Sequence, residues 1–199
     1  MKFKINFFME LRGPVWLMQP IPYLGEKIEE EWIYEPKIDG WRLQVIKYKD
    51  GRIEFWGRRL EKKPNWSCKL GYISENLKYL PSGTLLDCEL YTDKGRHKIP
   101  SLFKEKPDVI PIIFVFDIIF IENEFIGEKP LSERKKILEG INFKEPLILL
   151  KYRKLDDIYR AYKEEVSSGN EGIIIKKWDS IYKIAKDVPI ATIDWRKIK

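Results

Sequence analysis

The sequence has few of the residues that build disulfide frameworks or metal clusters. It contains two cysteines, Cys68 and Cys88, and one histidine, His97. Two distant cysteines form no C-x-x-C motif and no disulfide framework, so a disulfide-rich secreted domain and a zinc site are not indicated. The histidine lies between Arg96 and Lys98, as in a solvated loop, and receives no functional role. We therefore expect a protein of the reducing cytoplasm.

Long apolar runs are also missing. No run reaches the roughly 18 residues that a membrane span needs. The apolar start at residues 1–8 is soon broken by Glu10 and Arg12, unlike a signal peptide. We expect no membrane partner. The 199 residues, 44% of them hydrophobic, suffice for one domain with a real core. The net charge of +6 is a mild indication of a polyanionic partner.

The stretch from Glu35 to Arg42, Glu-Pro-Lys-Ile-Asp-Gly-Trp-Arg, carries the clearest chemical signal. It places Lys37 between two acids, each two residues away. In an extended chain Lys37 and Asp39 point the same way, because side chains alternate with period two. A lysine attacks well only when a dry pocket or a cation promotes the loss of its proton, so we expect such surroundings here. Taken alone, a Lys-x-Asp-Gly tetrad is more often a surface turn with a salt bridge.

Apolar alternation predicts a β-hairpin after this stretch. The alternation runs over residues 41–45 and resumes over 53–55, and Asp50-Gly51 between them is a strong turn signal. The returning strand ends at Arg58, which in isolation reads as a basic hairpin end facing water. Residues 67–80 have helical apolar spacing.

Two further strands are predicted. Over residues 84–90, Asp87 and Glu89 share one face and apolar side chains share the other. Such a pair of carboxylates can reach a metal or a ribose, although any half-exposed strand has the same pattern. Residues 112–121 are continuously apolar and contain Phe116, which is typical of a strand buried on both faces.

Helices are predicted in the second half of the chain. One begins with Ser132 as N-cap and stops at Gly140. Another covers residues 156–168, where apolar residues recur at helical spacing. By contrast, residues 1–30 contain several prolines, so we expect an irregular segment there, and it offers no candidate functional residue.

The last part of the chain adds charged residues around apolar strands. Glu171 and Lys176 flank three isoleucines at 173–175. These two residues have opposite parity, so Glu171 must precede the strand, or the strand must twist or bulge. At the end of the sequence, Lys197 and Lys199 share one face of an extended segment.

In this order, the motifs resemble those of the covalent nucleotidyltransferases, which include ATP-dependent DNA ligases, RNA ligases and mRNA capping enzymes. The matching motifs are Glu-x-Lys-x-Asp-Gly-x-Arg at 35–42, Gly-Arg at 57–58 where Ser-Arg is usual, Leu-Asp-Cys-Glu-Leu at 86–90, Phe-Asp at 116–117, Pro-Leu-x-Glu-Arg at 130–134, Glu-Gly-x-x-x-Lys at 171–176 and Trp-x-Lys-x-Lys at 195–199. The Pro-Leu-x-Glu-Arg element is similar to that of many DNA ligases. The resemblance implies an α+β fold, with an ATP-grasp-like nucleotidyltransferase core of antiparallel sheets and flanking helices.

The resemblance also implies a role for each matching residue. Lys37 would be the catalytic nucleophile, which attacks ATP and carries AMP. Phe116 would stack on adenine and Lys176 would contact the α-phosphate. The implied cofactor-binding residues are Glu35, Ile38, Arg42, Arg58, Glu89, Phe116, Lys176, Lys197 and Lys199. Mg²⁺, with Mn²⁺ as the alternative, would be held by Glu171 and Glu89.

On this interpretation residues 1–199 form a single adenylation domain, without the C-terminal OB-fold domain that is common in the family. We expect a monomer that acts on nicked duplex DNA. An RNA ligase acting on an RNA-containing duplex and a capping-type guanylyltransferase are the enzymatic alternatives, and ATP against GTP or nicked DNA against nicked RNA would separate them. The non-enzymatic alternative is a nucleotide- or nucleic-acid-binding module, which would bind without forming a covalent adduct.

Overall fold

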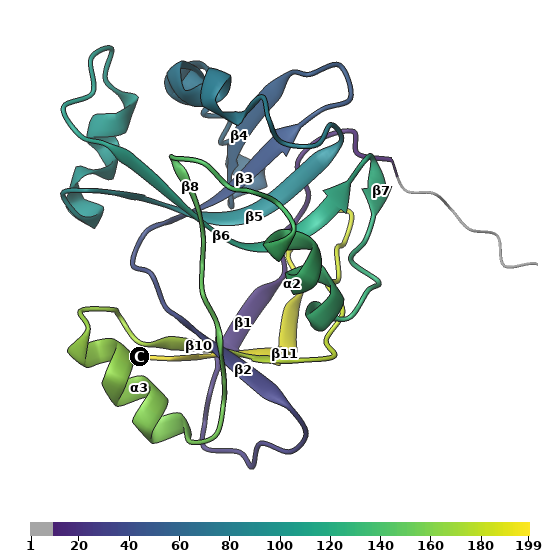
Figure 1. Ribbon diagram of the computed structural model, residues 1–199, viewed down its shortest axis with the longest axis vertical. Coiled ribbons are helices and arrows are strands. Elements are labelled where there is room, and N and C mark those ends of the chain that lie inside the picture. The colour runs from purple at the N-terminus through teal and green to yellow at the C-terminus, as the bar shows by residue number, and fades with distance from the viewer. Residues whose placement is uncertain (1–9) are drawn as a thin grey trace, which may run out of the picture.

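The computed structural model describes residues 10–199, which form two β-sheets with short helices at their sides (Figure 1). The smaller sheet has five strands in the order β1 (Gln19–Pro22), β11 (Ala191–Ile198), β10 (Ile173–Lys177), β2 (Trp32–Pro36) and β9 (Arg153–Lys154). The larger sheet has the order β4 (Ile53–Gly57), β3 (Trp41–Lys47), β5 (Thr84–Thr92), β6 (Pro111–Ile121) and β7 (Glu124–Phe125), with β8 (Leu147–Leu149) beside β6. The apolar start at residues 1–8, which we compared with a signal peptide, lies outside the described residues.

Most strand pairs are antiparallel, which confirms the predicted α+β fold. Two pairs are parallel, β1 with β11 and β6 with β8. The predicted hairpin is present as β3 and β4, and Val45 faces Phe55 across it. The strand predicted at residues 84–90 is present as β5, which extends two residues further, and it pairs with both β3 and β6.

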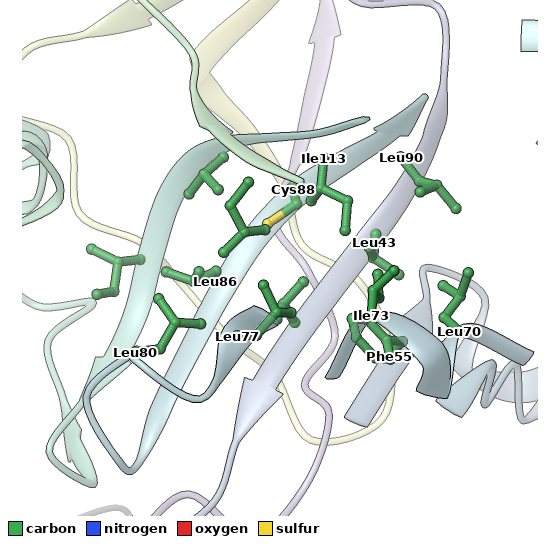
Figure 2. Packing of buried hydrophobic residues seen from close by; sticks show 14 of the residues in the cluster. Leu43, Phe55, Leu70, Ile73, Leu77, Leu80, Leu86, Cys88, Leu90 and Ile113 are labelled. Atoms are coloured by element: carbon green, nitrogen blue, oxygen red, sulfur yellow. The ribbon is translucent and has the colours of Figure 1, made fainter. Parts of the chain in front are cut away.

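One face of the larger sheet is covered by the segment that follows β4. This segment contributes Leu70, Ile73 and Leu77, which pack against Leu43 and Leu86 of the sheet (Figure 2). We predicted one helix over residues 67–80. The structure instead has a four-residue α-helix, α1 (Ser67–Leu70), followed by a 3₁₀-helix, η2 (Gly71–Leu77). The glycine at the junction is a poor α-helix former, and the apolar spacing is kept by the tighter helix.

The two predicted later helices are present. The helix α2 (Leu131–Glu139) stops at Gly140 as expected, but Ser132 is not its N-cap. The N-cap is Pro130, and no side chain caps this end. Instead, the amides of Leu131 and Ser132 donate to the carbonyls of Ser180 and Trp178, so a neighbouring loop satisfies the first turn.

The helix α3 (Ile158–Ser167) begins after Asp157, whose carboxylate accepts a hydrogen bond from the amide of Arg160. Figure 1 shows α3 against the five-stranded sheet, where Ala161 packs with Ile173 and Ile175 of β10. Among residues 10–199, no helix combines the length and apolar character that crossing a bilayer would need.

Candidate active site

The loop that carries Lys37 joins the two sheets, because β2 belongs to the smaller sheet and β3 to the larger one. A cleft of about 660 Å³ lies around this loop. All residues that the sequence predicted for catalysis, nucleotide binding or metal binding line it: Glu35, Lys37, Ile38, Arg42, Arg58, Glu89, Phe116, Glu171, Lys176, Lys197 and Lys199. They come from both sheets and from positions as far apart as 35 and 199, so the fold brings the motifs to one place. Their individual roles stay predictions.

Lys37 contacts Glu171 rather than Asp39. The Lys37 ammonium bonds to one oxygen of Glu171, and the Nζ of Lys199 lies 2.5 Å from the other. Asp39 turns away to the rim, where its Oδ1 lies 3.3 Å from the Nε of Arg96. The expected parallel direction of Lys37 and Asp39 relied on strand alternation, which ends with β2 at Pro36. The two side chains have different partners, although both line the cleft.

The Glu171 carboxylate is held as an anion. Partial burial works to raise its pKa, but the hydrogen bonds from Lys199 and Lys37 outweigh this effect and keep the pKa below the ordinary value of 4.5. Glu171 lies before β10, which resolves the parity conflict as one of the two predicted solutions. The next residue, Gly172, has a φ of 153°, and a Cβ there would collide with the carbonyl oxygen of Ile198.

Backbone hydrogen bonds fix the position of this loop. The amide of Lys37 donates to the carbonyl of Gly172 over 2.9 Å, and the amide of Glu171 donates to the carbonyl of Lys37 over 3.2 Å. Because these bonds extend the pairing between β2 and β10, the two charged side chains start from backbones held side by side.

The guanidinium of Arg42 is held in place by the buried carboxylate of Asp87. Its Nε and NH2 atoms each lie 2.5 Å from an oxygen of Asp87, and Tyr182 donates to Asp87 over 2.6 Å. Burial alone would lower the pKa of Arg42, but the charge of Asp87 raises it above the ordinary value. The guanidinium carbon lies 4.7 Å from the centre of the Phe116 ring. Only Glu89 of the predicted carboxylate pair on β5 lines the cleft, because Asp87 is fully buried.

At the Phe116 end of the cleft, Lys176 is almost completely buried. Its Nζ lies 2.7 Å from Glu35, 4.6 Å from the centre of the Phe116 ring and 4.1 Å from that of the Trp195 ring. Burial is the main cause that lowers the pKa of Lys176 to about 8, and the charge of Lys135 acts in the same direction. The ammonium lies close to Glu35 but makes no hydrogen bond of good geometry, and its contact with an α-phosphate stays a prediction.

The rim of the cleft explains one departure from the family pattern. Glycine at position 57 stands where serine is usual, and the indole of Trp66 lies over it. A Cβ on Gly57 would be 2.7 Å from the Trp66 ring. The neighbouring Arg58 is exposed, and its NH1 lies 3.3 Å from the Oε1 of Gln19. The indole of Trp66 thus occupies the space that a side chain at position 57 would need, which favours glycine there.

Sequence reasoning missed several residues at the site. We expected no functional residue in residues 1–30, but Gln19 and Pro20 line the cleft because β1 pairs with β11. Lys135, on α2, bonds to Glu35 without lining the cleft itself. A glutamine among prolines and a lysine in a helix carry no distinguishing signal. Of these two, Lys135 was the easier to find, since it directly follows the Pro-Leu-x-Glu-Arg element.

The acidic residues of the cleft fit an ion that needs few protein ligands. Within residues 10–199, no group of three or more His, Cys, Asp or Glu side chains is arranged to hold a metal. Glu171 and Glu89 are two carboxylates on one cleft. Burial, reinforced by Asp87, raises the pKa of Glu89 to about 7, against the opposing charges of Arg42 and Lys37. Two carboxylates suit Mg²⁺ bound together with substrate phosphates and water.

Comparisons with known proteins agree with this arrangement. A family model described as "ATP dependent DNA ligase domain" matches residues 17–199. The DNA ligase of Archaeoglobus fulgidus is 31% identical, over 100% of this chain and 37% of that protein. "DNA ligase 2" of Korarchaeum cryptofilum is 26% identical, over 87% of this chain and 32% of that protein. The chain therefore spans about a third of the length of these curated relatives.

Solved structures share the fold. The structure of "mycobacterial DNA ligase D complexed with ATP and MES" has a TM-score of 0.67 at 20% identity, over 90% of this chain and 58% of that one. The structure titled "Pmar-Lig_Pre." has a TM-score of 0.72 at 18% identity, over 94% of this chain and 47% of that one. At these identities the likeness establishes the fold alone.

Proposed function

Because the chain belongs to the family of ATP-dependent DNA ligase domains, we propose that residues 1–199 form an adenylation domain that seals nicks in duplex DNA through a covalent lysyl-AMP intermediate. The observation that carries the proposal is the contact between Lys37 and Glu171 in a cleft lined by cations from both sheets. That arrangement combines a nucleophile, a carboxylate that positions it and fixed positive charge for phosphates.

In the first step, the Lys37 ammonium loses a proton to solvent, while Glu171, which contacts it, stays ionised and holds the side chain in place. The Nζ lone pair then attacks the α-phosphorus of ATP. The bond from that phosphorus to the bridging oxygen breaks, and pyrophosphate leaves with the electron pair. Lys197 and Lys199 line the cleft and would offset the negative charge that develops on the phosphates.

In the later steps, the 5′-phosphate of a nick attacks the AMP phosphorus and releases Lys37. The 3′-hydroxyl then attacks the 5′-phosphorus and AMP leaves. Glu171 and Glu89 would hold Mg²⁺ or Mn²⁺. The ion would supply charge neutralisation at the phosphates and favour the neutral form of Lys37.

We further propose a monomer in the cytoplasm. All the residues predicted for the reaction line one cleft of this chain. Both cysteines are free, Cys68 exposed and Cys88 buried, which suits a reducing compartment.

The intact mass of the purified protein tests the proposal. After incubation with ATP and Mg²⁺, the wild-type chain should gain one AMP, and Lys37→Ala should not. Lys69→Ala, an exposed lysine on α1, is the matched control and should gain AMP like the wild type. Nicked DNA should then be sealed, and adenylylation by GTP or sealing of nicked RNA alone would favour the guanylyltransferase or RNA ligase instead.

A chain that binds ATP and never gains mass would contradict the proposed activity. Supplying nicked DNA that already carries AMP on its 5′-phosphate separates the steps, because sealing of this substrate requires no lysyl-AMP. Failure with this substrate as well would favour the binding-module alternative.

A further inference from the structure

Three charged side chains form a compact buried cluster beneath the Phe116 end of the cleft. They are Glu35 of β2, Lys135 of α2 and Lys176 of β10, and each is at most 2% exposed. Lys135 bonds to one carboxylate oxygen of Glu35, and the Nζ of Lys176 lies 2.7 Å from the other. Lys135 also donates to the carbonyl of Phe116 over 2.8 Å.

The cluster holds two cations for one anion, which is costly to bury. A cluster that served only to stabilise the core would need no second lysine. The other buried pair of α2, Arg134 with Asp117, is balanced one to one, with two hydrogen bonds of 2.8 and 3.0 Å. The charge of Asp117 also acts on Lys135 and Lys176. What distinguishes Glu35 is that it lies between two lysines and also lines the cleft.

The three residues differ in their access to the cleft. Glu35 and Lys176 line it, whereas Lys135 does not and reaches the cleft only through Glu35 and the Phe116 carbonyl. Lys135 thus ties the acid to the same strand that presents the aromatic ring. Lys135 therefore influences the position of the Glu35 carboxylate relative to the Phe116 ring.

We propose that Lys135 is a positioning residue that fixes the Glu35 carboxylate as a hydrogen-bond acceptor beside Phe116, and thereby makes the cleft prefer adenine over guanine. The inference rests on the proposed function and adds that an adenine stacked on Phe116 presents its edge to Glu35, since both residues line the cleft. Adenine carries an amino group on C6, which donates to a carboxylate. Guanine carries a carbonyl oxygen there, which a fixed carboxylate repels.

Without Lys135, one oxygen of Glu35 loses its partner and only Lys176 restrains the carboxylate. The acceptor then no longer has a fixed direction relative to the Phe116 ring. Discrimination between the two bases should fall, because both the attraction for adenine and the repulsion of guanine depend on the orientation of Glu35.

The test uses equilibrium binding of the α,β-methylene analogues of ATP and GTP, which bind without forming an adduct. Lys135→Met removes the charge at similar volume and should reduce the ratio of the two Kd values by about tenfold, the size of one charge-assisted hydrogen bond. Lys136→Met, the exposed neighbour on the same helix, is the matched control and should keep the wild-type ratio. Lys135→Arg should recover most of it.

A purely structural role makes a different prediction. Lys135→Met would then lower the melting temperature and weaken both analogues equally, with an unchanged ratio, and that result would overturn the inference. If methionine prevents folding, Lys135→Gln, which keeps a donor without charge, serves in its place. A wild-type chain that binds both analogues equally also overturns it. Loss of adduct formation with retained, Lys135-dependent adenine preference would instead count against the proposed activity alone.

Discussion

Arg42 and Asp87 form a doubly bonded ion pair between neighbouring strands, and the acid is fully buried beneath the cleft. Arg42 alone reaches the cleft, where it lies over Phe116. Asp87 therefore holds Arg42 in place and has no access to a nucleotide or a metal. The pair stabilises the fold only while both charges are present, because a buried charge without its partner is strongly unfavourable.

Asp87→Asn should destabilise the protein by on the order of 3 kcal/mol, since it leaves the Arg42 guanidinium uncompensated. Urea unfolding followed by tryptophan fluorescence measures this loss. Asp108→Asn, which breaks an exposed pair with Lys104, should leave the unfolding midpoint close to wild type. Equal effects of the two changes would show that burial of Asp87 contributes nothing to the stability of the pair.

Gly57→Ala should destabilise the rim of the cleft, because the new Cβ would lie 2.7 Å from the Trp66 ring. The melting temperature should fall, and part of the loss should return in the double variant with Trp66→Leu, which removes the ring. Gly71→Ala is the control, because nothing lies within 4 Å of its Cβ position and its φ of −57° suits alanine. It should be neutral or slightly stabilising. Additive losses at positions 57 and 66 would contradict the proposed match.

The Glu89 carboxyl should make stability depend on pH. Burial first, and then Asp87, raise its pKa from the ordinary 4.5 to about 7. The native state therefore holds this proton more tightly than the unfolded state. The resulting stability is fully present below about pH 4.5 and is lost as the pH rises through about 7.

Comparison with Glu89→Gln isolates this contribution. The free energy of unfolding of the wild type minus that of the variant should fall by on the order of 3 kcal/mol between pH 4.5 and pH 7.5. Added Mg²⁺ should restore part of the loss at the higher pH if the ionised carboxylate binds it. A difference that stays constant with pH would show that Glu89 titrates normally in the folded protein.

The strands and the set of residues that line the cleft could be predicted from the sequence. The contacts between those residues were harder to predict. Strong alternation and the Asp50-Gly51 signal determine the hairpin locally. Motif order identifies residues that meet in the cleft, because each motif is short and its own residues carry the chemistry. The pairing of Lys37 with Glu171 spans 134 positions, and no local pattern distinguishes it from a pairing with Asp39.

Other errors have the same origin in long-range packing. Ser132 has the right residue type for an N-cap, but the amides of that helix end donate to carbonyls of a loop 46 positions further along the chain. β1 enters the cleft only because it lies beside β11, the last strand of the chain. Lys135 became a candidate only when its partner, 100 positions earlier, was located in space.

The two backbone hydrogen bonds at Lys37 restrict what can move. The amide of Lys37 donates to the carbonyl of Gly172, and its carbonyl accepts from the amide of Glu171. Rotation about the four side-chain torsions is therefore the main freedom left to this residue. The side chain of Lys37 is therefore free to rotate, whereas its main chain is fixed. Its amine can change partners by side-chain rotation without any rearrangement of the main chain, so the conformational entropy that such a change involves is that of one side chain.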